Sequence, residues 1–203
     1  MDISFIFSLI VLVMSVVVHE VAHGYTAEFL GDPTARLEGR LTLNPIKHLD
    51  PVGSILVPII TFFSGGVIFG WAKPVPFNPY NLKNRKWGEA LVALAGPASN
   101  LAIALLFSLI IRYGVGFGFI PQSFAEISVL IIITNISLAV FNLIPIPPLD
   151  GSKILFSLIP LRYEHVHRWI ERYSLVLVLL LLFFLWQYIA PLIPWLFRLF
   201  TGI

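Results

Sequence analysis

Two histidines and a glutamate stand at the end of a long apolar run near the N-terminus, in the stretch VVVHEVAH. His19 and His23 are four residues apart, so on a helix of 3.6 residues per turn both project from one face and can reach one ion. Glu20 lies about 100° further round the helix, where its carboxylate can take a proton from a water molecule without itself binding the ion. This H-E-x-x-H spacing is typical of sites in which zinc activates water for hydrolysis.

The same residues also fit a simpler interpretation, in which the histidines lie at the membrane interface and Glu20 extends toward the headgroups. The apolar surroundings weigh against it, because a carboxylate left without compensation is costly there. The chain has no cysteine, so a metal ion would have to be held by histidine and carboxylate ligands.

A tetrahedral catalytic zinc site needs three protein ligands and one open position. The candidate for the third ligand is Asp150, which follows the apolar segment 127–144 in the stretch IPIPPLDG. The three prolines before it end a helix and open its backbone. Alternatively, Asp150 caps the short helix expected from SKILFSLI. The spacing leaves both roles open.

The composition indicates the environment in which these residues lie. Of 203 residues, 58% are hydrophobic and 12% are charged, against about 45–50% apolar residues in soluble domains. This predicts an all-α polytopic membrane protein, organised as one domain over residues 1–203. The net charge of +2 is too small to indicate a nucleic-acid partner.

Apolar segments set the expected architecture of about four to five transmembrane helices. The segments are residues 3–23, 52–71, 89–111, 127–144 and 174–190. The segment 52–71 is interrupted by Ser-Gly-Gly, which favours a re-entrant segment over an extra full span. Lys and Arg concentrate in the connections, which the positive-inside rule places in the cytoplasm, with the N-terminus outside. These connections are residues 24–50, 71–88 and 145–173. Five full spans would leave one basic connection outside.

Three motifs in this order resemble the site-2 protease family of intramembrane zinc metalloproteases. They are HEVAH, AGPASN at residues 95–100 and NLIPIPPLDG at residues 142–151. The resemblance covers residues 16–151 and corresponds to a proteolytic core made by spans 3–23, 89–111 and 127–144. Nothing in the chain resembles the PDZ or CBS domains of some relatives, so it looks like a minimal, core-only member.

The resemblance implies a role for each matching residue. His19, His23 and Asp150 would bind one zinc ion per chain, and Glu20 would be the general base. Asn142 would position or polarise the substrate carbonyl. The substrate would be a transmembrane protein or peptide, cut within the lipid bilayer. The small size of the chain indicates a plasma membrane, and the basic connections place the active site toward the cytoplasm. The oligomeric state is left open.

A small β element near the active site is also expected, because relatives place a sheet or re-entrant loop beside the zinc. LEGRLTL at 37–43 alternates like an edge strand, and WAKPVPF at 71–77 is an extended, proline-bearing stretch. These segments could receive an unwound substrate by strand addition. Alternatively, they are connectors with no substrate contact.

The remaining polar candidates have simpler explanations. AGPASN suits close helix packing, with Asn100 as a hydrogen bonder either to a metal ligand or between helices. His165 and His167 are two apart, so they point away from each other on a helix that suits the lipid headgroups. His48, in a polar loop, is expected to be solvated. A divalent metal transporter or a non-catalytic membrane scaffold are the alternative functions, but neither needs Glu20 beside His19.

Overall fold

The computed structural model describes residues 3–56, 72–114, 120–159 and 164–202. Three helices in it are long and apolar enough to cross a membrane. They are α1 (Ile3–Phe29), α4 (Arg85–Gly114) and α5 (Gln122–Asn142). Such helices satisfy their backbone hydrogen bonds internally, which lipid cannot do for them. The predicted polytopic all-α class is therefore confirmed, and the predicted spans at 3–23, 89–111 and 127–144 coincide with these three helices.

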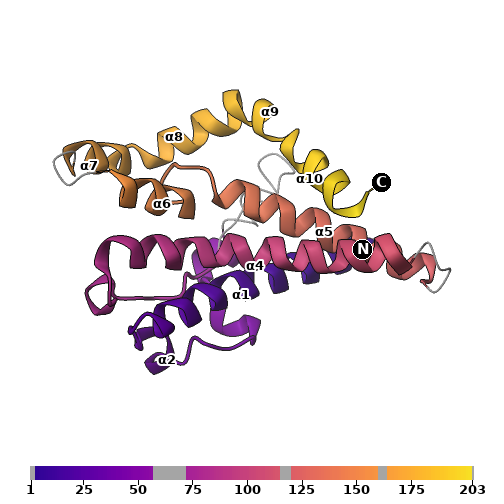
Figure 1. Cartoon of the computed structure of the whole chain (residues 1–203), viewed down its shortest axis with the longest axis horizontal. Coiled ribbons are helices and arrows are strands. Elements are labelled where there is room, and N and C mark those ends of the chain that lie inside the picture. The colour runs from indigo at the N-terminus through magenta and orange to yellow at the C-terminus, as the bar shows by residue number, and fades with distance from the viewer. Residues whose placement is uncertain (1–2, 57–71, 115–119, 160–163, 203) are drawn as a thin grey trace.

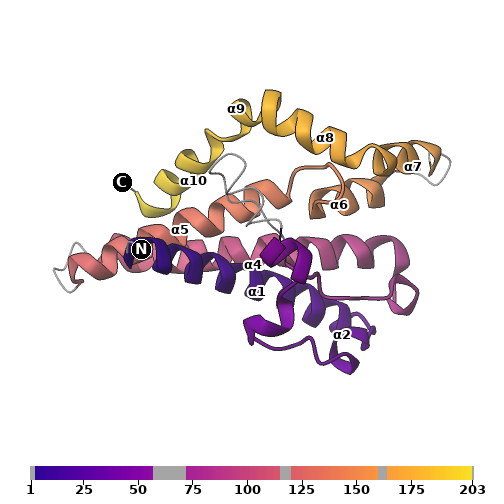
Figure 2. The same ribbon diagram turned by 180° about the vertical axis from the view of Figure 1, so that it is seen from behind.

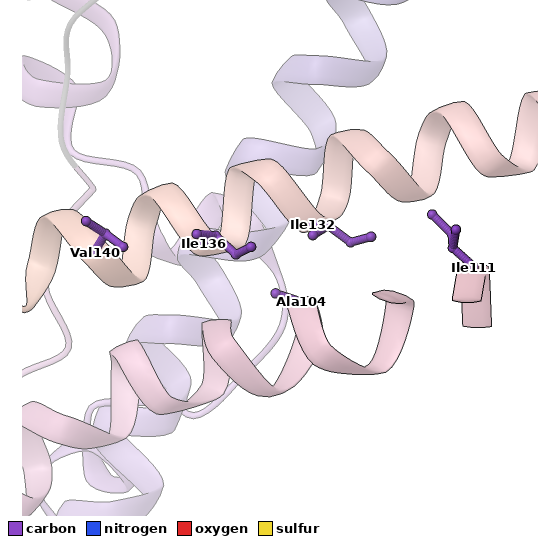
Figure 3. Close-up of a cluster of buried hydrophobic side chains, with 5 residues drawn as sticks. All are labelled: Ala104, Ile111, Ile132, Ile136 and Val140. Carbon is purple, nitrogen blue, oxygen red and sulfur yellow. The ribbon is translucent and has the colours of Figure 1, made fainter. Parts of the chain in front are cut away.

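The helix α4 forms the centre of the bundle and packs against both α1 and α5 (Figures 1 and 2). Its contact with α5 contains a cluster of buried aliphatic side chains (Figure 3). The cluster consists of Ala104, Ile111, Ile132, Ile136 and Val140. Most of the large apolar side chains outside this seam stay exposed on the helix surfaces, as expected where lipid replaces water.

The C-terminal part forms a bent arm that arches over α5 (Figure 1). It begins with α7 (Glu164–Arg172), continues through α8 (Ser174–Leu180) and α9 (Trp186–Ile189), and ends with α10 (Leu192–Thr201). The axis of α10 is bent by 44° relative to that of Ser174–Ile189, and α10 packs on α4 and α5. The predicted span 174–190 is thus the first half of a bent pair, which makes a fourth candidate span.

Short elements occupy the connections at the end of the bundle where α1 finishes. They are α2 (Thr34–Leu37), the short helical turns Pro45–His48, Pro51–Leu56 and Pro79–Asn81, and α6 (Asp150–Leu158). The carbonyl oxygen of Leu30 accepts a hydrogen bond of 2.9 Å from the amide of Lys83. This bond holds the end of α1 next to the residues that lead into α4.

The prediction of a small β element is wrong for the residues that the structure describes, none of which forms a strand. In the stretch 37–43, the chain leaves α2 and turns at Gly39, whose φ of +63° suits glycine. Residues 72–77 are extended but pair with no strand. Alternation of apolar and polar residues over a short segment is a weak signal, because a strand is stable only when it pairs with a partner strand. The predicted segment 52–71 lies mostly outside the described residues.

Candidate metal centre

Three side chains from two distant parts of the sequence converge on one point. The Nε2 atoms of His19 and His23 lie 3.0 and 3.2 Å from Oδ2 of Asp150. All three side chains are buried, and their ligand atoms lie within 4.8 Å of one another. Zinc bonds of about 2.0–2.1 Å in a tetrahedron give ligand separations of about 3.3 Å. The cluster therefore has the chemistry and spacing to hold one metal ion.

Asp150 reaches this cluster because α6 begins directly after the proline-rich turn. Leu149 is the residue that precedes the helix, and Asp150 is its first helical residue. Its carboxylate faces the imidazoles, so the alternative in which Asp150 caps α6 is wrong. Burial raises the pKa of the Asp150 carboxyl, but the two imidazoles lower it further, so its pKa lies below the ordinary value. The carboxylate is therefore ionised, as a metal ligand must be.

Both histidines are held by a partner on the ring nitrogen that points away from the cluster. Nδ1 of His23 lies 2.6 Å from the carbonyl oxygen of Val92 on α4. Because a carbonyl can only accept, Nδ1 of His23 is protonated, which leaves Nε2 as the nitrogen that can bind a metal. Nδ1 of His19 lies 2.6 Å from Oδ1 of Asn100, also on α4. The expected interhelical role of Asn100 is thus confirmed.

Two glycines let the backbone approach the cluster closely. A Cβ atom on Gly96 would lie 2.4 Å from Nε2 of His23 and 2.5 Å from Nε2 of His19. The close packing predicted at AGPASN is therefore present. The side chains packed against Gly96 are the two imidazoles. A Cβ atom on Gly151 would lie 2.2 Å from the carbonyl oxygen of Leu143, so only glycine lets α6 start so close to the end of α5.

Glu20 is held by the extended stretch 72–77. The amide of Val75 donates a 2.8 Å hydrogen bond to Oε2 of Glu20. The stretch is itself anchored, since Nη2 of the buried Arg40 donates to the carbonyls of Lys73 and Pro74 at 2.8 and 3.2 Å. One carboxylate oxygen of Glu20 is therefore oriented by the backbone, and the carboxylate lies on the helix that carries both histidines.

Asn142 lies at the last turn of α5, where its side-chain amide donates a 3.0 Å hydrogen bond to the carbonyl oxygen of Leu138. Its place just before the proline-rich turn agrees with the order of the motif. A role toward substrate stays a prediction.

Several residues at or near the site were not singled out from the sequence. Val75 has no distinguishing side chain, because it acts through its backbone. Ser15 and Asn135 do carry a signal, since polar side chains inside apolar spans need a partner.

His48 was expected to be solvated, which is wrong: it is 1% exposed, and its Nε2 lies 2.8 Å from the carbonyl oxygen of Thr42.

Membrane-length helices bring together two histidines and an aspartate that could hold a metal ion, with a glutamate beside them, which is the set of groups typical of metal-dependent hydrolases. The model of the family described as Peptidase family M50 matches residues 7–185. The chain therefore belongs to this family of metalloproteases.

Relatives with assigned names agree with this membership. The chain is 38% identical over 177 residues to the Bacillus subtilis protein named "Putative zinc metalloprotease YwhC", a match that covers 85% of this chain and 78% of that protein. It is 32% identical over 151 residues to a Mycolicibacterium smegmatis protein named "Putative zinc metalloprotease Rip2", covering 70% of this chain and 53% of that one. No solved structure matches the chain significantly.

Proposed function

We propose that the protein is a zinc-dependent intramembrane endopeptidase that hydrolyses peptide bonds in or near transmembrane segments of other membrane proteins. One observation carries the proposal. His19 and His23 on α1, a helix of membrane-spanning length, meet Asp150 at the start of α6 in one ligand cluster, and Glu20 is next to His19 on α1. Membership of a peptidase family and the names of the relatives favour zinc as the ion.

Each residue of the site has a defined task in this reaction. A bound zinc ion would polarise the scissile carbonyl and lower the pKa of water from about 15.7 toward 7. His19, His23 and Asp150 would hold it. Glu20 takes the proton from the attacking water and passes it to the leaving amine. Asn142, at the end of α5, binds the substrate carbonyl.

The extended stretch 72–77 is the segment along which a substrate would reach the site. A helical substrate shields its amides with its own hydrogen bonds, so it must be unwound before cleavage. The stretch already lies against Glu20 through Val75. We infer that an unwound substrate aligns along it, and that Lys153, whose ammonium lies 5.3 Å from the ring centre of Phe77, ties α6 to the same stretch.

The test compares the wild type with Glu20→Gln, both purified in detergent. Cleavage of a model single-span substrate and bound zinc are measured on the same preparations. Glu20 is not a ligand, so Glu20→Gln should keep its zinc and lose cleavage by about 100-fold or more. Cleavage at the wild-type rate would remove Glu20 from its role.

Metal flux provides the contrast with a transporter. We expect proteoliposomes that contain the wild type to take up no more zinc than empty vesicles. Uptake that survives in Glu20→Gln while neither protein cleaves the substrate would overturn the peptidase proposal.

A further inference from the structure

Behind His19, a chain of buried polar side chains connects three helices. Asn100 on α4 contacts Asn135 on α5, and Asn135 contacts Ser15 on α1. Both asparagines are 0% exposed and Ser15 is 6% exposed. Such groups are costly inside a membrane protein unless their donors and acceptors are paired. Within the described part of the chain Asn135 forms no hydrogen bond with the ligand cluster, yet only the side chain of Asn100 separates it from His19.

The orientation of Asn135 is set by a backbone carbonyl. Its Nδ2 lies 2.9 Å from the carbonyl oxygen of Ile131 and 2.9 Å from Oγ of Ser15. Because the Ile131 carbonyl can only accept, the atom facing it must be the amide nitrogen. The oxygen of Asn135 therefore faces Asn100.

The same reasoning carries the direction on to the histidine. Oδ1 of Asn135 lies 2.8 Å from Nδ2 of Asn100, which also faces the carbonyl oxygen of Ser15 at 3.3 Å. Two acceptors on that side require the amide nitrogen of Asn100 there, so its oxygen faces His19. At 2.6 Å from this oxygen, Nδ1 of His19 must be the donor.

We propose that Asn135 is a positioning residue that acts through Asn100 to keep the proton of His19 on Nδ1. With the proton there, Nε2, which lies 3.0 Å from Oδ2 of Asp150, is the nitrogen left to bind a metal ion. Without Asn135, the Asn100 amide loses the acceptor that best fixes its orientation. A rotated Asn100 would present its NH2 group to Nδ1 and favour the other tautomer, which blocks the metal-binding nitrogen. The inference rests on the metal-binding role proposed for His19.

The first measurement compares zinc affinity, by competition with a chromogenic chelator, between the wild type and Asn135→Leu. Leucine has a similar shape but can neither accept nor donate. Loss of an outer partner of a ligand typically lowers metal affinity about 10- to 100-fold, and we expect a loss in this range. Ser128→Ala is the matched control, because Ser128 is on the same helix, is 0% exposed, and has an Oγ without a hydrogen-bond partner. It should bind zinc like the wild type.

A second measurement does not depend on whether the variant folds. In zinc-free wild type with 15N-labelled histidine, NMR should show that Nδ1 of His19 carries a proton, and the signal is assigned by its loss in His19→Gln. An unprotonated Nδ1 would overturn the inference, as would wild-type zinc affinity in a folded Asn135→Leu. Failure of the metal-centre proposal looks different, since His19→Gln would then keep its zinc.

Discussion

Gly96 contributes to the candidate metal centre through the absence of a side chain. It faces the Nε2 atoms of both histidines, at distances where no Cβ atom is tolerated. The two imidazoles therefore occupy space that the side chain of any other residue at this position of α4 would fill. At the scale of single residues, the candidate site consists of three potential ligands, the two acceptors that orient the imidazole rings, and a glycine that leaves room for those rings.

We predict that Gly96→Ala abolishes tight zinc binding while the helical bundle is kept. The added methyl group would contact both ligand nitrogens, so the imidazoles must turn away or the helices separate. Bound zinc per chain and cleavage should both fall at least tenfold. Ala98→Val, which adds bulk to an exposed position two residues further along α4, is the control. Full zinc occupancy in Gly96→Ala would contradict the described geometry.

At the scale of elements, a buried carboxylate fastens the end of α1 to the stretch that returns to α4. Asp32 is 0% exposed. It accepts hydrogen bonds from the hydroxyl of Thr34 at 2.6 Å, from the amide of Asn78 at 2.6 Å and from Nδ2 of Asn81 at 2.8 Å. Burial raises the pKa of the Asp32 carboxyl, but these donors lower it further, to below its ordinary value of 3.8.

This lowered pKa predicts a pH-dependent contribution to stability. The unfolded chain takes up the Asp32 proton at a higher pH than the folded chain, so the contribution is complete above the ordinary value of 3.8 and is lost as pH falls below it. We expect Asp32→Asn to lower the free energy of unfolding by about 2 kcal/mol at neutral pH. The difference from wild type should shrink in acid.

Thermal unfolding in detergent between neutral pH and pH values below the ordinary pKa measures this difference. Glu38→Gln, an exposed carboxylate in the same connection, should unfold like the wild type throughout. An Asp32→Asn effect that grows in acid would have the wrong sign for a hydrogen-bonded carboxylate.

At the scale of the whole molecule, the hydrogen bond between Leu30 and Lys83 places the end of α1 and the start of α4 at the same end of the bundle. The connection between them therefore leaves and returns on one side. This fits a proposed topology in which α1, α4, α5 and the C-terminal arm cross the membrane; the positive-inside rule places the basic connections of this topology in the cytoplasm. The metal centre would lie toward that face, because His23 is in the last two turns of α1.

Single cysteines test this topology directly, because the natural chain contains none. We expect Lys83→Cys to react with a membrane-impermeant maleimide only after the cytoplasmic face is exposed. Tyr113→Cys, at the exposed far end of α4, should react from outside in intact cells. Labelling of position 83 from outside would reverse the proposed orientation.

The parts of this protein that depend on local geometry could be predicted from the sequence. Helical periodicity places His19 and His23 on one face whatever surrounds them, and membrane-length apolar runs define α1, α4 and α5. Local sequence could not decide whether Asp150 is a ligand or a helix cap, because Asp150 is 131 positions from His19. The resemblance to a known family favoured the ligand role before any packing was known.

Only the tertiary structure decided which groups meet across helices. It showed that residues 72–77 orient Glu20 without forming a strand, that Gly96 faces the imidazoles, and that Asn135 stands behind His19. These relationships depend on how helices rotate and approach one another. Many rotations bury similar apolar area, so hydrophobic pattern alone does not select one. The pairing of the few buried polar groups does, because each must find its partner.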